Sequence, residues 1–107
     1  MLSELNVRDY ADWRNQEKPH TLVDVREAWE LELARLAGAV HIPMQEIPFE
    51  VERLKELPQP LVMLCHAGIR SAQCAAYLSN QGFTEVYNLQ GGIHVWAEQI
   101  DPDVGFY

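Results

Sequence analysis

The stretch LVMLCHAGIRSAQCAAYL, residues 61–78, decides the fold. It opens with an unbroken apolar run, which is typical of a strand buried on both faces of a parallel sheet. Its second half has the small residues and the spacing of a helix, which is expected to end at Gly82. A short loop that begins with Cys65 joins the two halves. The cysteine is therefore expected at the carboxyl end of a buried strand, where open α/β sheets bind their ligands.

Strands and helices alternate along the rest of the chain. Asn6 can cap the first of the expected helices. Further strands are predicted at 21–25, 39–43 and 85–89, and further helices at 7–16, 26–36, 48–57 and 91–99. Trp29 and Phe49 are expected to face the core or a pocket. This alternation predicts an α/β fold with a parallel sheet covered by helices on both faces, and residues 1–107 are expected to form a single domain.

The composition argues against several classes of function. A formal net charge of −8 is unsuited to binding nucleic acid or an anionic membrane surface. The first ten residues lack the apolar segment of a signal peptide, and no apolar run is long enough to cross a membrane, so we expect a cytoplasmic protein. The two cysteines and four histidines lack the spacing of metal ligands, so no metal or cofactor is expected.

The loop after Cys65 has the features of a cradle for an anion. Gly68 can adopt a positive φ, which lets backbone N–H groups turn inward. The following helix adds the partial positive charge of its N-terminus. Such surroundings favour a thiolate over a thiol, and the thiolate is the nucleophilic form of cysteine. The sequence therefore predicts that Cys65 is a catalytic nucleophile.

The chain around the cysteine is poor in acids. Residues 57–84 contain no Asp or Glu, although 16 of the 107 residues are acidic. Arg70 is the one formal charge in this window, and His66 is titratable. Buried strands and tightly packed helices are poor in charge for structural reasons alone. The position of Arg70 nevertheless favours a locally positive rim that suits a small anionic substrate.

Four motifs, LVDVRE, GAVHIP, CHAGIRSA and LQGGIHVWAE, follow one another in the order of a known family. From about residue 21 to residue 98 the chain resembles a single-domain rhodanese, of the thiosulfate sulfurtransferase family. The resemblance implies a rhodanese-like, five-stranded parallel sheet. It also implies that Cys65 takes a sulfane sulfur from a small anionic donor such as thiosulfate and becomes a persulfide. The acceptor is then cyanide or a thiol, with thioredoxin as a candidate protein acceptor.

The resemblance assigns roles to further residues. The active-site loop that would hold the persulfide with its backbone amides consists of His66, Ala67, Gly68, Ile69, Arg70 and Ser71. Arg70 would also shape the loop and attract anions. Asp24 and Arg26 would brace the site, and Gly91 and Gly92 would pass close to the loop.

The two residues after the cysteine depart from the common family pattern. Many members have arginine, lysine or glutamine and then glycine or serine, where this chain has His66 and Ala67. Part of the positive charge near Cys65 would then depend on pH, and donor preference with it.

Three alternatives compete with the sulfurtransferase hypothesis. A phosphatase or arsenate reductase of the cell-cycle phosphatase type also uses a cysteine in an amide cradle, but its loop has five residues between cysteine and arginine. Here four residues separate Cys65 from Arg70, and this tighter ring suits a single sulfur. Rhodanese-like domains can also be binding or regulatory modules. A Cys65–Cys74 disulfide is the third alternative, but Cys74 has the surroundings of a small core residue.

Overall fold

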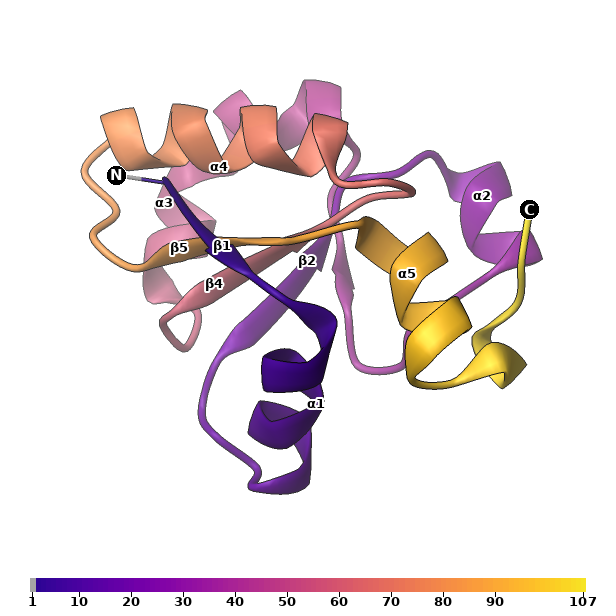
Figure 1. The fold of residues 1–107 in the computed structure, drawn as a ribbon. Helices are drawn as coiled ribbons and strands as arrows, with labels where there is room; N and C mark the ends of the chain where they lie inside the picture. Colours follow the sequence, from indigo (N-terminus) through magenta and orange to yellow (C-terminus); the bar gives the residue numbers. More distant parts are fainter. Residues whose placement is uncertain (1) are drawn as a thin grey trace.

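The computed structural model describes residues 2–107 and contains an all-parallel sheet of five strands (Figure 1). The strands are β1 (Leu2–Leu5), β2 (Thr21–Asp24), β3 (Val40–His41), β4 (Leu61–Leu64) and β5 (Val86–Leu89). Their order across the sheet is β1-β5-β4-β2-β3. β4 is the central strand, because it pairs with β2 on one side and with β5 on the other.

Helices cover both faces of this sheet, with α3 and α4 on one face and α1 and α5 on the other (Figure 1). The helices are α1 (Val7–Asn15), α2 (Ala28–Leu33), α3 (Val51–Glu56), α4 (Ile69–Asn80) and α5 (Gly92–Gln99), with 3-10 segments η1 (Met44–Phe49) and η2 (Pro102–Val104). The predicted fold class is confirmed. None of the helices within residues 2–107 is long and apolar enough to cross a membrane.

β4 links the two halves of the core. Leu61 and Met63 belong to the apolar cluster under α3 and α4, whereas Val62 and Leu64 belong to the cluster under α1 and α5. This division follows from the alternation of side chains along a strand. All four residues are fully buried, and each contributes about 1.5–3 kcal/mol of hydrophobic stabilisation. Cys65 thus follows a strand that is fixed on both faces.

Two aromatic side chains do not lie where the sequence predicts. Phe49 is 87% exposed, so its predicted core position is wrong. It ends the 3-10 segment η1, which contains Pro48, and the α-helix begins only at Val51. A 3-10 helix has fewer residues per turn than an α-helix, so the side chain of Phe49 points in a different direction from the one that α-helical spacing predicts, away from the core. Trp29 is 59% exposed, and its ring meets that of Tyr107 edge-on.

Candidate active site

Cys65 lies directly beyond β4 and is almost completely buried, with an exposed fraction of 1%. The backbone N–H of Gly68 donates to Cys65 Sγ at 3.1 Å, and the Oγ of Ser71 lies 3.2 Å from the same sulfur. Gly68 caps α4 with a φ of +98°, a left-handed conformation that favours glycine. The positive φ turns the chain so that its amide faces the sulfur, and Ser71 follows in the first turn of α4.

The N-terminus of α5 holds the loop from the other side. The amide of Ile93 donates to the Cys65 carbonyl at 2.9 Å, and the amide of His94 donates to the His66 carbonyl at 3.0 Å. A Cβ atom added to Gly92 would come within 2.5 Å of both carbonyl oxygens. This second position of the glycine pair therefore has to remain without a side chain.

Arg70 forms a bidentate ion pair with Glu30 of α2. Its two guanidinium nitrogens donate to the two carboxylate oxygens at 2.7 and 2.8 Å. The hydrogen bonds from Arg70 lower the pKa of Glu30 to about 2, although burial acts in the opposite direction. Glu30 is therefore anionic at neutral pH, and the charge of Arg70 is balanced by a partner from outside the acid-poor window.

Asp24 and Arg26 form a buried ion pair at 2.7 Å. Arg26 also donates to the Ala34 carbonyl at 2.9 Å and to the Tyr107 hydroxyl at 3.1 Å. That hydroxyl in turn donates to Glu30 at 2.6 Å. The pair is thus connected to the active-site loop through Tyr107 and Glu30.

The ring of Tyr107, the last residue, lies against the ring of His66. The centroids of the His66 and Tyr107 rings are 4.1 Å apart, and His94 lies 5.8 Å from His66. Burial lowers the pKa of His66, and His94 lowers it further. The imidazole is therefore neutral at pH 7, and it adds positive charge beside Cys65 only in acid.

Asn88 and Glu4 also belong to this site, although the motifs did not indicate them. Asn88 on β5 accepts a hydrogen bond from Ser71 and donates to the Gly68 carbonyl and to the Glu4 carboxylate. A polar side chain within the buried strand EVYNL was the available signal for Asn88. Glu4 comes from β1, which is an edge strand too short and too polar to be evident from the sequence.

Cys74 lies in α4 on the core side and is 3% exposed. Burial raises the pKa of its thiol to about 11, and the charge of Cys65 acts in the same direction. Both cysteines are free, so the structure contains no Cys65–Cys74 disulfide. The prediction that Cys74 is a core residue is confirmed.

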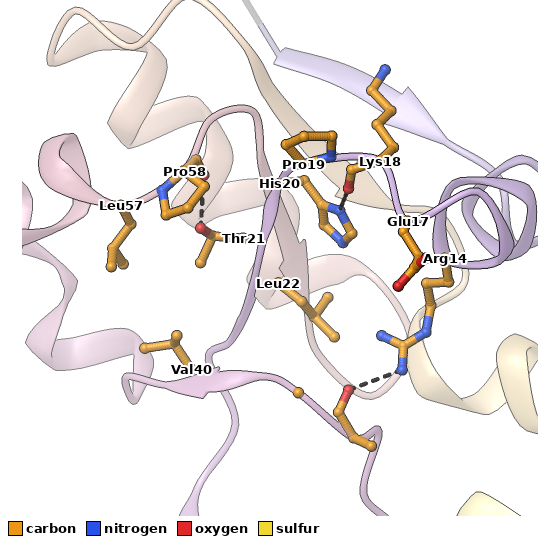
Figure 2. A pocket seen from close by; sticks show the side chains of 12 residues that line it. Arg14, Glu17, Lys18, Pro19, His20, Thr21, Leu22, Val40, Leu57 and Pro58 are labelled. Carbon is orange, nitrogen blue, oxygen red and sulfur yellow. Dashed lines mark hydrogen bonds between the residues drawn. The ribbon is translucent and has the colours of Figure 1, made fainter.

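A hollow lies at the amino end of β2, the opposite end of the sheet from Cys65 (Figure 2). It has a volume of about 540 Å³. Its cationic side chains already have partners: Arg14 donates to the Ala37 carbonyl at 3.0 Å, and the Lys18 ammonium sits 3.9 Å from the centre of the Trp13 ring. Within the described part of the chain, no three His, Cys, Asp or Glu side chains are grouped to hold a metal ion.

A central parallel strand that is followed directly by a cysteine, a tight amide loop and a helix defines an α/β domain with a candidate cysteine nucleophile. The chain belongs to the rhodanese-like domain family, whose model matches residues 6–99. The resemblance seen in the motifs is thereby confirmed.

Two curated relatives differ in how much of their length the chain covers. The chain is 38% identical over 81 residues to the thiosulfate sulfurtransferase GlpE of Vibrio cholerae, covering 76% of each protein. It is 36% identical over 107 residues to the probable adenylyltransferase/sulfurtransferase MoeZ of Mycobacterium tuberculosis. That match covers 98% of this chain but only 27% of MoeZ, so the chain spans about a quarter of that relative.

Solved structures agree with the fold. A rhodanese-like domain protein from Staphylococcus aureus superposes with a TM-score of 0.79 at 28% identity, covering 88% of this chain and 90% of that one. The human single-domain sulfurtransferase TSTD1 has a TM-score of 0.77 at 20% identity, covering 90% of this chain and 96% of that one. At this identity the human structure supports the fold alone.

Proposed function

We propose that the protein is a sulfurtransferase that carries a sulfane sulfur on Cys65. The observation that carries this proposal is the position of Cys65 Sγ, which receives the Gly68 N–H at the carboxyl end of β4. The sulfurtransferase names of the GlpE and MoeZ relatives support the same class of reaction. Four residues between Cys65 and Arg70 make a ring that suits a sulfur better than a phosphate.

The proposed reaction has two displacements at sulfur. The Cys65 thiolate attacks the outer sulfur of thiosulfate, the S–S bond of thiosulfate breaks, and sulfite leaves with the electron pair. Cyanide or a thiolate then attacks the outer sulfur of the persulfide, and the electron pair returns to Sγ. The products are thiocyanate or a new persulfide, and a protein thiol such as that of thioredoxin is a suitable acceptor.

In this proposal, the negative sulfur of Cys65 is stabilised more by backbone dipoles than by nearby cationic side chains. The Gly68 amide faces Sγ, and α4 begins at Ile69 directly after it. Arg70 is neutralised by Glu30, so its main proposed role is to hold the shape of the loop. We expect thiosulfate, a dianion, to bind weakly.

A second candidate function is that of a binding or regulatory module without turnover. Cys65 is only 1% exposed, and the ring of Tyr107 lies on the neighbouring His66. If this arrangement did not open, a sulfur donor could not reach Sγ.

Intact-mass spectrometry distinguishes the sulfurtransferase from the alternatives. The measurement is made under anaerobic conditions, because oxygen would oxidise an exposed persulfide. Thiosulfate should add the mass of one sulfur atom to the protein, and cyanide should remove it. The adduct should be absent in Cys65→Ser and present in the matched control Cys74→Ser. Absence of an adduct on a protein that iodoacetamide still alkylates at Cys65 would overturn the proposal. Hydrolysis of a phenyl phosphate would then favour the phosphatase alternative, and inertness the binding module.

A further inference from the structure

We propose that Asn88 is a positioning residue that directs the hydroxyl proton of Ser71 and thereby disfavours the thiolate form of Cys65. This inference rests on the proposed function, because it concerns the same cysteine. Asn88 is 3% exposed and lies at the centre of a chain of hydrogen bonds that runs from Glu4 on β1 to the sulfur. Asn88 lies on β5, so a strand other than the one before Cys65 contacts the active-site loop through this residue.

The surroundings of Asn88 fix the orientation of its side-chain amide. Nδ2 lies 3.1 Å from the Gly68 carbonyl oxygen and 3.0 Å from one carboxylate oxygen of Glu4. A carbonyl and a carboxylate can only accept hydrogen bonds, so the NH₂ group has to face them. The amide oxygen Oδ1 therefore faces Ser71.

This orientation determines where the Ser71 proton lies. Ser71 Oγ is 2.5 Å from Asn88 Oδ1, and Oδ1 has no proton to offer. The contact is attractive only with the single hydroxyl proton of Ser71 between the two oxygens. The contact between Oγ and Cys65 Sγ at 3.2 Å has a geometry in which Ser71 could also donate, but a hydroxyl has only one proton. While that proton lies between Oγ and Oδ1, Oγ presents a lone pair to Sγ and can accept a thiol S–H.

The forms of Cys65 differ in what they require from Ser71. A thiol donates its S–H to Oγ, which suits the bond between Ser71 and Asn88. A persulfide carries its negative charge on the outer sulfur, so Sγ needs no second donor. A bare thiolate does need one, and Ser71 can supply it only by turning its proton away from Asn88. Asn88 therefore favours the thiol and persulfide forms, and it makes Cys65 a poorer leaving group in the second displacement.

Other charged groups surround this network from several elements. Arg70 and Cys74 of α4 interact electrostatically with Cys65, and His66 of the loop interacts with His94 of α5 and with Glu30 of α2. Glu4 contacts Asn88 itself and is exposed, so it polarises the amide without being part of the core.

The test measures alkylation of Cys65 by iodoacetamide as a function of pH, with the peptide identified by mass. In Asn88→Ala, Ser71 is free to donate to the thiolate. At pH values below the midpoint of the profile, Cys65 of Asn88→Ala should be alkylated about three- to tenfold faster than Cys65 of the unmodified protein. In a Ser71→Ala background the same Asn88→Ala change should have no effect, because Asn88 acts through Ser71. Glu4→Ala should give a smaller rise and provides the test if Asn88→Ala does not fold.

Equal effects of Asn88→Ala with and without Ser71 would overturn the inference, because a merely structural role acts on both backgrounds. An unchanged profile in folded Asn88→Ala would also overturn it. In single-turnover experiments, Asn88→Ala should also pass its sulfur to cyanide faster than the unmodified protein. Alkylation needs no sulfur transfer, so failure of the proposed function would appear as a missing sulfur adduct while the coupling between Asn88 and Ser71 could still be measured.

Discussion

Single side chains set the charge beside Cys65, and the chain supplies less positive charge there than its loop suggests. Arg70 is paired with Glu30, and burial keeps His66 neutral at pH 7. Residues 57–84 contain no acid, but the space around the loop does, because the fold brings Glu4 and Glu30 there from other segments. Donor preference should therefore depend on these two carboxylates as well as on the loop.

The Glu30–Arg70 pair predicts a specific dependence of stability on pH. The pKa of Glu30 is lowered by Arg70 to about 2 in the folded protein, which is below the ordinary value for glutamate. The ionised carboxylate therefore stabilises the fold at neutral pH, and this contribution is lost as the pH falls from about 4.5 toward 2. At pH 7, Glu30→Gln should lower the free energy of unfolding by about 2 kcal/mol, a value reduced for the solvent around Arg70.

Urea unfolding at a series of pH values checks this prediction. The difference between the unmodified protein and Glu30→Gln should be constant between pH 6 and 8 and should shrink below about pH 4.5. Glu32→Gln, which alters an exposed acid on the same helix, is the matched control and should change little. A difference that persisted undiminished at pH 2 would show that the ion pair is not its cause.

At the scale of residues, the sequence was sufficient to predict which residues form the loop, but not which residues from other segments contact it. Cys65, Gly68 and Arg70 are neighbours in the chain, so one motif revealed them. Glu30 and Tyr107 reach the loop from distant segments. Their contacts depend on the packing of α2 and of the C-terminal residues, which no local pattern encodes.

Among the elements, the C-terminal segment 105–107 connects α2 to the active-site loop (Figure 1). The Arg35 amide donates to the Val104 carbonyl at 3.0 Å, and a Cβ on Gly105 would come within 2.5 Å of the Leu33 carbonyl oxygen. These contacts accompany an extended backbone at Ala34, so α2 ends earlier than its apolar spacing predicts. Such a tertiary contact overrides a local helical pattern.

This segment predicts that Tyr107 limits access to the sulfur. Tyr107→Ala removes the ring that lies on His66, so Cys65 should react several-fold faster with a bulky disulfide reagent. Tyr107→Phe keeps the ring and loses the hydroxyl bonds to Glu30 and Arg26, so it should destabilise the fold by about 1 kcal/mol with little change in access. Thiol reaction rates and thermal unfolding together check both variants. Equal reaction rates in Tyr107→Ala and Tyr107→Phe would exclude a shielding role for the ring.

For the molecule as a whole, the net charge of −8 opposes the approach of an anionic donor. Salt screens this repulsion, since the Debye length falls from about 30 Å at 0.01 M to about 8 Å at 0.15 M. Single-turnover formation of the persulfide from thiosulfate should therefore become about twofold faster over this range. Alkylation by neutral iodoacetamide is the control and should not respond. A rate that falls with salt would instead support the locally positive rim suggested by the sequence.

The two hydrogen bonds from α5 to the carbonyls of Cys65 and His66 limit how the loop can be redesigned. An insertion at that point has no room, because Gly92 already lies against both carbonyl oxygens. Added length has to enter at Ala67 or Ile69, whose side chains are exposed. A graft meant to enlarge the ring for a tetrahedral oxyanion should therefore leave Cys65 and His66 unchanged and lengthen the side of the loop that faces solvent.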